Sequence, residues 1–202
     1  MPVEAQPVGL LLAAGSSRRF GGDKLLHPLA SALPVAVAAL RSLLAGLPRV
    51  LAVVRADQTA LSRVLAAAGA EPVPFADADR GMGASLAFGV SRLPGSIPGC
   101  LVSLADKPFI RSESVAAVRD AFAGREGAVV LPTYRGRRGH PVAFGRAHFP
   151  ELERLDGDAG GRQFLHAHPE VVETLALDDA GIVRDVDRPE DLVAGPDLQA
   201  GR

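Results

Sequence analysis

The chain has 202 residues, enough for one domain with a sizeable apolar core, and its 22 basic and 23 acidic residues give a formal net charge of -1. That balance gives no general attraction to nucleic acid or to an anionic membrane, so we expect neither as a partner. The sole cysteine excludes an internal disulfide framework. The chain has no basic signal-peptide region and no apolar run of about 20 residues, so it is predicted to be soluble and cytoplasmic.

Strand-like and helical patterns alternate along the first two thirds of the chain. The strand-like runs are Val8 to Ala14, Val50 to Val54, Glu71 to Pro74, Gly99 to Leu104 and Ala128 to Leu131. Between them, Pro34 begins one helical pattern, and Asp57 and Ser112 are expected to cap two more. Cys100 lies in the fourth run, which predicts a buried thiol rather than a nucleophile. The alternation predicts an α/β fold, a mostly parallel twisted sheet with helices on both faces.

The rhythm changes after residue 131. Residues 133–141, TYRGRRGHP, are expected to form a polar loop, and the helical patterns that follow look like additions rather than another strand-helix repeat. We therefore predict a single domain over residues 1–202, with a nucleotide-binding part at 1–131 and a substrate-side elaboration at 132–193. The polar residues 194–202 are expected to be a flexible tail.

The run LLLAAGSSRRFGGDK at residues 10–24 joins a buried strand to a loop rich in glycine, serine and basic residues. Gly15, Ser16 and Ser17 allow backbone N–H groups to approach a polyphosphate closely, and Arg18 and Lys24 add matching positive charge. Neither the Walker A spacing nor the G-x-G-x-x-G spacing of dinucleotide-binding folds is present. The alternative interpretation is an ordinary turn between strand and helix with solvated basic residues.

Asp106 follows directly after the strand-like run that ends at Leu104. Because ligands bind beyond the carboxyl ends of parallel strands, Asp106 and the loop from Gly15 are expected to face one cleft. A carboxylate at that point suits Mg²⁺, which takes one or two carboxylates together with substrate phosphates and waters. The alternative is an aspartate that turns the chain before Pro108.

Asp185 and Asp187 lie in the stretch DVDRPEDL at residues 185–192. If Val186 is extended, both side chains point to the same side, where either could supply a second metal ligand. The competing interpretation is a capping box formed by Asp187 and Glu190. The sequence does not decide which aspartate binds metal.

Five stretches of the chain resemble, in order, the nucleotidyltransferases related to the molybdenum cofactor cytidylyl- and guanylyltransferases, a MobA-like NTP transferase family. They are LAAGSSRRFGGDK at 12–24, GMGASLAFGV at 81–90, LVSLADKPF at 101–109, RGHPVAF at 138–144 and DVDRPEDL at 185–192. The resemblance spans nearly the whole chain and implies a Rossmann-like nucleotidyltransferase fold of the glycosyltransferase-A-like kind.

The resemblance also implies a distribution of roles. Arg18, Lys24 and Asp106 would be catalytic, and the metal ligands would be Asp106 with Asp185 or Asp187. The residues implied to bind the nucleotide are Leu12, Ala13, Ala14, Gly15, Ser16, Ser17, Arg18, Lys24, Gly81, Met82, Gly83 and Ser85. The residues implied to bind the acceptor are Arg138, Gly139, His140 and Pro141. From the residues alone, a plain loop entering a helix is the favoured interpretation of Gly81 to Ser85.

The implied reaction is Mg²⁺-dependent transfer of a nucleoside monophosphate from a nucleoside triphosphate to a phosphorylated pterin-type acceptor, molybdenum cofactor, with release of pyrophosphate. CTP is favoured because LAAG and RGHPV resemble the cytidylyltransferases. Phe20 and Lys107 depart from the residues usual in relatives, and the extra cation beside Asp106 bears on acceptor choice. The alternatives are a guanylyltransferase, an isoprenoid-precursor cytidylyltransferase, or a non-catalytic chaperone that hands cofactor to a molybdoenzyme partner.

Overall fold

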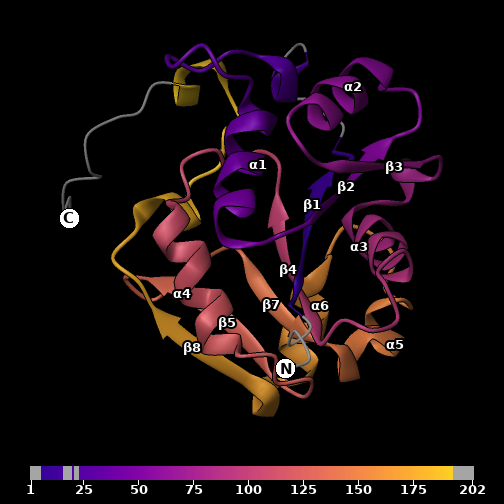
Figure 1. Cartoon of the computed structure of the whole chain (residues 1–202), viewed down its shortest axis with the longest axis vertical. Helices are drawn as coiled ribbons and strands as arrows, with labels where there is room; N and C mark the ends of the chain where they lie inside the picture. The colour runs from indigo at the N-terminus through magenta and orange to yellow at the C-terminus, as the bar shows by residue number, and fades with distance from the viewer. Residues whose placement is uncertain (1–5, 16–19, 21–22, 193–202) are drawn as a thin grey trace.

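The computed structural model describes residues 6–15, 20 and 23–192. Within them, one sheet has the strand order β3-β2-β1-β4-β7-β5-β6, and β8 pairs with β5 (Figure 1). The strands are β1 (Val8–Ala13), β2 (Val50–Arg55), β3 (Glu71–Phe75), β4 (Gly99–Leu104), β5 (Val129–Tyr134), β6 (Arg137–Arg138), β7 (Val142–Gly145) and β8 (Val172–Ala176). β1, β2, β3 and β4 pair in parallel, whereas β7 runs antiparallel to both β4 and β5. The predicted mostly parallel α/β sheet is confirmed.

Helices cover both faces of the sheet. They are α1 (Val35–Gly46), α2 (Thr59–Ala67), α3 (Met82–Ser91), α4 (Ser112–Phe122), α5 (Phe149–Leu152) and α6 (Gly161–Ala167). Short 3-10 turns lie at η1 (Lys24–Leu26), η2 (Ala78–Arg80), η3 (Arg146–His148), η4 (Pro169–Val171), η5 (Ala180–Val183) and η6 (Pro189–Leu192). Over the described ranges, no helix is long and apolar enough to cross a membrane.

The unbroken apolar sequence of β1 follows from this two-sided cover. Leu11 and Ala13 pack into a core shared with α1, α2 and α4. Leu10 and Leu12 point the other way, into a core shared with α3, α5 and α6. Successive side chains of a strand alternate between faces, so a strand buried on both faces has apolar residues at every position.

The helix starts agree with the sequence only in part. α1 begins directly after Pro34, as expected, but the residue before α2 is Gln58 rather than Asp57. The Asp57 carboxylate instead accepts a hydrogen bond from the Arg55 guanidinium. The residue before α4 is Arg111, so Ser112 is the first helical residue and not the cap. The two capping expectations are therefore wrong.

The expected polar loop at residues 133–141 is largely a β-hairpin. β5 continues to Tyr134, and Arg135 and Gly136 have φ values of 49° and 76°, which turn the chain into β6. Two residues with positive φ form the tight turn whose twist matches the flanking strands. β7 then lies against β4, with Val102 opposite Val142. Residues just before Val142 therefore lie beside the carboxyl end of β4.

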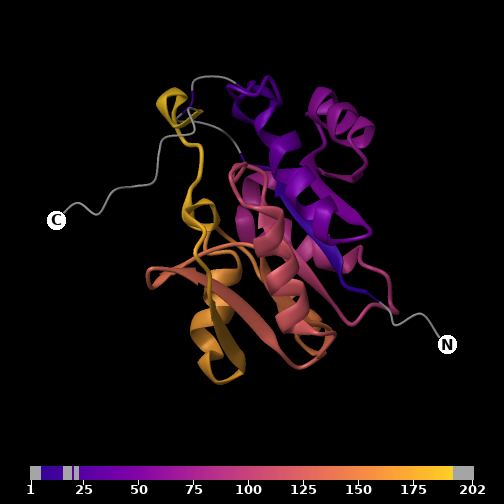
Figure 2. The ribbon, with the colours of Figure 1, turned by 60° about the vertical axis from the view of Figure 1, so that its left-hand side comes forward.

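The last described segment returns from β8 to the carboxyl edge of the parallel strands (Figure 2). The buried Asp179 carboxylate holds its start, accepting from the Ser114 hydroxyl at 2.7 Å and from the Arg111 and Gly181 backbone N–H groups at 3.0 and 2.9 Å. These bonds join η5 to the beginning of α4. They direct the chain that follows toward Asp187.

Candidate active site

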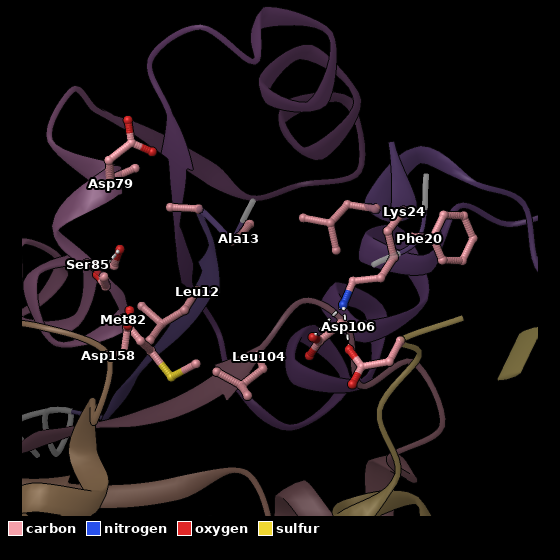
Figure 3. A pocket seen from close by; sticks show the side chains of 16 residues that line it. Leu12, Ala13, Phe20, Lys24, Asp79, Met82, Ser85, Leu104, Asp106 and Asp158 are labelled. Atoms are coloured by element: carbon pink, nitrogen blue, oxygen red, sulfur yellow. Dashed lines mark hydrogen bonds and ion pairs between the residues drawn. The ribbon is translucent and has the colours of Figure 1, made fainter. Parts of the chain in front are cut away.

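A cavity of about 560 Å³ lies at the carboxyl edge of the parallel strands (Figure 3). That volume is typical of small-molecule sites. Its lining residues come from β1, η1, η2, α3, the end of β4 and two later loops: Leu12, Ala13, Ala14, Gly15, Phe20, Lys24, Leu25, Ala78, Asp79, Gly81, Met82, Ser85, Leu104, Asp106, Asp158 and Asp187. Figure 3 shows Lys24 and Asp106 at one end and Ser85, Asp79 and Asp158 at the other.

Strand pairing brings the two expected loops together. β1 and β4 are parallel neighbours, with Leu12 opposite Leu104, and the Ala105 backbone N–H donates to the Leu12 carbonyl at 3.0 Å. The segments that follow β1 and β4 therefore leave the sheet side by side, and Gly15 and Asp106 line the same cavity. The segment from Gly15 to Lys24 also includes Ser16, Ser17 and Arg18, which lie outside the described residues.

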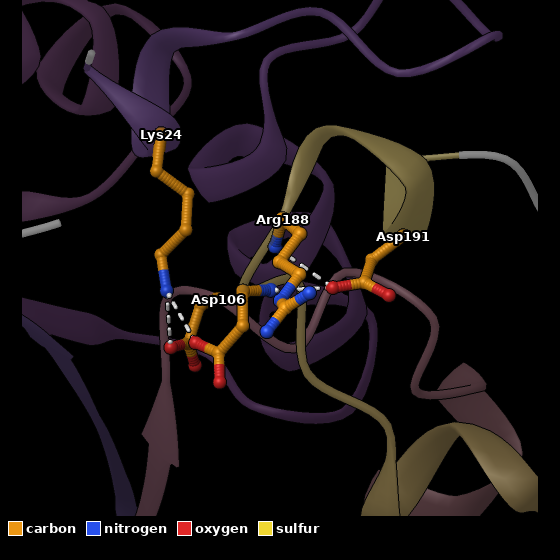
Figure 4. A network of polar contacts seen from close by, with 5 residues as sticks. Lys24, Asp106, Arg188 and Asp191 are labelled. Atoms are coloured by element: carbon orange, nitrogen blue, oxygen red, sulfur yellow. Dashed lines mark hydrogen bonds and ion pairs between the residues drawn. The ribbon is translucent and has the colours of Figure 1, made fainter. Parts of the chain in front are cut away.

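The lysine–carboxylate cluster, defined as Lys24, Asp106 and Asp187, joins three segments far apart in the sequence (Figure 4). The Lys24 ammonium donates to Asp106 Oδ2 at 2.9 Å and to Asp187 Oδ1 at 3.3 Å. Lys24 begins η1 and its side chain is 10% exposed. Within this structure, the ammonium is the counter-ion of both carboxylates.

Asp187 reaches this place because the preceding residues are fixed to the β4 exit. Val186 is fully buried, and its backbone N–H donates to the Asp106 carbonyl at 2.8 Å. The Asp191 carboxylate accepts from the Asp187 and Arg188 backbone N–H groups at 2.9 and 2.8 Å, and these bonds lower its pKa. The carboxylate that caps this turn belongs to Asp191 and not to Glu190.

Asp185 lies apart from the cluster. Its side chain is exposed and does not line the cavity, and its charge acts on Lys107 instead. The geometry thus favours Asp187 over Asp185 as the partner of Asp106. The sequence could not choose between them.

The donor set fits a hard divalent cation. Asp106 Oδ1 is shielded from solvent and has no hydrogen-bond partner among the described residues, although buried oxygens are nearly always paired. Within the described residues, no three or more His, Cys, Asp or Glu side chains are grouped so that they could hold a metal ion. Mg²⁺ is usually held by one or two carboxylates, with substrate oxygens and waters completing its ligand set.

The opposite end of the cavity is formed by the start of α3 and the loop before α6. The Ser85 hydroxyl donates to the Gly81 carbonyl at 3.1 Å. Gly81 has a φ of 102°, and a Cβ there would lie 2.6 Å from Asp158 Oδ1, so the two residues are in close contact. Gly83 does not line the cavity, and its N–H donates to the Gly157 carbonyl at 2.7 Å. That N–H is therefore engaged within the protein.

Several lining residues were not predicted. Asp79 and Asp158 come from segments about 80 positions apart, and neither lies in a stretch that the sequence pattern singled out as a ligand site. Asp79 pairs with Arg55 at 2.7 Å. Nothing in the sequence indicated that the apolar residues Leu25, Ala78 and Leu104 line the cavity. Phe20, which lines it too, stood out in the sequence only because relatives usually have another residue there.

The implied acceptor residues Arg138, Gly139, His140 and Pro141 lie outside the lining of this cavity. His140 Nδ1 is 3.3 Å from the Val102 carbonyl, which can only accept, so the Nδ1 proton is assigned to that bond. Removal of the ring from water, reinforced by the positive charge of Lys107, lowers the pKa of His140 to about 4. His140 is therefore a neutral group beside the end of β4.

Lys107 follows Asp106 and is 7% exposed. Burial lowers the pKa of its ammonium, while the carboxylates of Asp185 and Asp106 act in the opposite direction.

Cys100 is the second residue of β4. Its thiol is fully buried, which raises its pKa to about 12. The prediction of a buried, unreactive thiol agrees with this burial.

The family described as the MobA-like NTP transferase domain matches residues 9–172 of this chain. The chain belongs to this family. The match confirms the family resemblance and covers four of the five sequence stretches, whereas DVDRPEDL at 185–192 lies beyond the matched residues.

Two relatives, and two solved structures of one further protein, are similar to this chain over most of their length. Purine catabolism protein PucB of Bacillus subtilis (strain 168) is 30% identical over 195 residues, covering 91% of this chain and 93% of its own. Nicotine blue oxidoreductase of Paenarthrobacter nicotinovorans is 32% identical over 193 residues, with the same coverage. Rv0371c from Mycobacterium tuberculosis H37Rv is 29% identical, with a TM-score of 0.81, covering 92% of this chain and 95% of its own. A second structure of Rv0371c is a complex with manganese, at 27% identity, a TM-score of 0.77 and the same coverage.

Proposed function

We propose that this protein transfers a nucleoside monophosphate, CMP in preference to others, from a nucleoside triphosphate to a phosphorylated pterin-type acceptor. In this reaction an oxygen of the acceptor's phosphate bonds to the α-phosphorus, the bond from that phosphorus to the bridging oxygen breaks, and pyrophosphate leaves. The observation that carries the proposal is the lysine–carboxylate cluster at one end of a cavity of about 560 Å³. Because the nucleophile is already an anion, no strong general base is required.

The charge of the cavity supports a need for a divalent cation. Its described lining carries the carboxylates of Asp79, Asp106, Asp158 and Asp187 against the single ammonium of Lys24. A triphosphate would be repelled by this arrangement unless a cation came with it. Asp106 and Asp187 would hold Mg²⁺, which, when bound, neutralises charge on the phosphates and on the departing pyrophosphate.

Lys24 would change partners when the nucleotide binds. With its carboxylates engaged by a cation, the ammonium is released from Asp106 and Asp187 and can donate to phosphate oxygens. Arg18 would add charge from the loop before it. Fixed positive groups that match developing phosphate charge are the main contribution of a protein to phosphoryl-type transfer.

The end of the cavity at Ser85 and Asp158 would take the base. A carboxylate there accepts a hydrogen bond from an exocyclic amino group such as that of cytosine, whereas uracil has a carbonyl at the same place. Guanine and adenine also carry amino groups, so the preference for CTP over GTP rests on the sequence resemblance at LAAG and RGHPV. The pterin-type acceptor, molybdenum cofactor, rests on the same resemblance.

The test is a panel of CTP, GTP, ATP and UTP, each incubated with molybdenum cofactor and either Mg²⁺ or Mn²⁺, with pyrophosphate release and the dinucleotide product measured. We expect CTP to give the fastest turnover, and Lys24→Met and Asp106→Ala each to lower it by at least about 100-fold, since each removes a charge that faces the phosphates. Exposed Arg154 provides a matched control, because Arg154→Gln removes a charge that does not line the cavity.

Two other outcomes would replace the proposal. If Asp106→Ala kept full biological activity and no nucleotide were consumed, the protein would be a non-catalytic cofactor carrier. If no nucleotide turned over but nicotine blue were oxidised or reduced in the presence of the protein, the activity in the name of the Paenarthrobacter relative would apply instead.

A further inference from the structure

The loop before α6 lies against the start of α3. The Gly83 N–H donates to the Gly157 carbonyl at 2.7 Å. A Cβ on Gly81 would lie 2.6 Å from the Gly157 carbonyl oxygen, and one on Gly83 would lie 2.5 Å from the Asp156 carbonyl oxygen. A side chain at either position would collide with the loop, so the two backbones can meet only because both residues are glycine. We call residues 156–158 the clamped loop.

An ion pair outside the cavity fastens the same loop. The guanidinium of Arg80, which ends η2, donates to Asp156 Oδ2 at 3.0 Å, and neither side chain lines the cavity. The second carboxylate oxygen, Asp156 Oδ1, accepts from the Gly157 N–H at 2.9 Å. Asp156 thus links η2 to the backbone of the clamped loop. These contacts fix the backbone on which Asp158 enters the cavity.

The polar side chains at this end of the cavity offer hydrogen-bond acceptors. The proton of the Ser85 hydroxyl is committed to the Gly81 carbonyl, so only its lone pairs remain for a ligand. Asp79 contributes a carboxylate, and Asp158 contributes another (Figure 3). The Asp158 side chain is exposed, and among the described residues none makes a hydrogen bond or an ion pair with it. Such a set favours the edge of a ligand that donates protons, as an amino group does.

We infer that the clamped loop reads the base of the nucleotide, with Asp158 as the specificity-determining residue and Arg80 as a positioning residue that acts through Asp156. This inference rests on the proposed function, which puts the triphosphate at Lys24 and Asp106 and leaves the base for the opposite end. The amino group of cytosine can donate to the Asp158 carboxylate, whereas uracil presents a carbonyl oxygen there, so that two acceptors would face each other. The loop therefore distinguishes cytosine from uracil at one ring position.

The test of Asp158 is the ratio of CTP affinity to UTP affinity, measured by calorimetric titration with Mg²⁺. The wild type should bind CTP at least about tenfold more tightly than UTP, because a hydrogen bond to a charged group is lost with uracil. Asp158→Asn should bring the ratio to about one or invert it, since the amide can donate to the uracil carbonyl. The ratio cancels the general effect of removing a negative charge near a triphosphate. Asp178→Asn, at an exposed position that does not line the cavity, is the matched control and should keep the wild-type ratio.

The test of Arg80 uses the same ratio in variants that leave the cavity lining intact. Arg80→Gln should lower the ratio a few-fold, because an exposed ion pair contributes little and the glycine contacts remain. Arg80→Lys keeps the charge and should keep most of the discrimination, and the control Arg154→Gln should change nothing. Pyrophosphate release by Arg80→Gln should show a raised KM for CTP with an unchanged kcat. A wild-type ratio in Arg80→Gln would overturn the positioning role.

The failures of the inference and of the proposed function are distinguishable. If the wild type binds neither CTP nor UTP with Mg²⁺, the proposed function fails. If the wild type binds the two alike, or if Asp158→Asn keeps the preference for CTP, the inference fails while nucleotide binding stands. If the wild type prefers UTP and Asp158→Asn loses that preference, the carboxylate accepts from the ring N–H of uracil, and the assignment to an amino group is overturned.

Discussion

Acidification should destabilise this protein through His140 in particular. The folded-state pKa of His140 is about 4, against an ordinary value of 6.5, because its ring is withdrawn from water and faces the charge of Lys107. As the pH falls below 6.5, the unfolded chain takes up a proton that the folded chain refuses, so stability is complete above pH 6.5 and is lost as the pH falls toward 4. A shift of that size corresponds to at most about 3 kcal/mol, given that the ring keeps some exposure.

The assay is urea unfolding of wild type and His140→Gln at pH values from 7 to 4.5. The glutamine amide can still donate to the Val102 carbonyl, but it does not titrate. The carboxylates common to both proteins cancel, so the difference between the two profiles isolates His140. We expect the wild type to lose about 2 kcal/mol more than the variant over this range.

Parallel pH profiles would refute the reasoning, and so would a His140 ring signal that titrates near pH 6.5 in NMR spectra of the folded protein. Lys107→Met supplies a further check, because removing that positive charge should raise the pKa of His140.

Three further predictions concern the scaffold. Asp179→Ala leaves three buried donors unpaired and should cost about 3 kcal/mol or more in urea unfolding, whereas Asp178→Ala, at an exposed neighbour, should stay within about 0.5 kcal/mol. Gly99→Ala places a Cβ 2.4 Å from the backbone carbonyl oxygen of Phe144 and should lower the melting temperature by several degrees. The control Gly127→Ala, whose Cβ would have no atom within 4 Å, should leave it unchanged. Equal melting temperatures for the two variants would contradict the packing at β4. Cys100 should react with a thiol reagent only after unfolding, and rapid reaction of the native protein at pH 8 would disprove its burial.

The sequence predicted the parallel part of the sheet mainly because β1, between two helical layers, is apolar at every position, and β2 and β4 are nearly so. It failed for β8, whose residues are exposed or half-buried and show no apolar run. It also failed for the hairpin at Arg135 and Gly136, because an arginine with positive φ is not a usual turn signal.

The same contrast holds in the site. Gly15 and Asp106 each lie two residues after a strand end, and Lys24 closes the loop that follows β1, so local sequence located them, and they line one cavity. Asp158 reaches the cavity through contacts between a loop and the start of α3, which no local pattern encodes. The burial of Lys107 was equally hidden, because lysine is among the residues least often buried.

The most direct test of the central claim is calorimetric titration of CTP into wild type and Asp106→Asn, each with Mg²⁺, with Mn²⁺ and with a chelator. The account predicts that wild type binds CTP only when a divalent cation is present, and that Asp106→Asn weakens this binding at least about 100-fold. Equal affinity of the wild type in chelator, or unchanged affinity of Asp106→Asn, would contradict a site in which Asp106 and Asp187 bring the cation to the triphosphate.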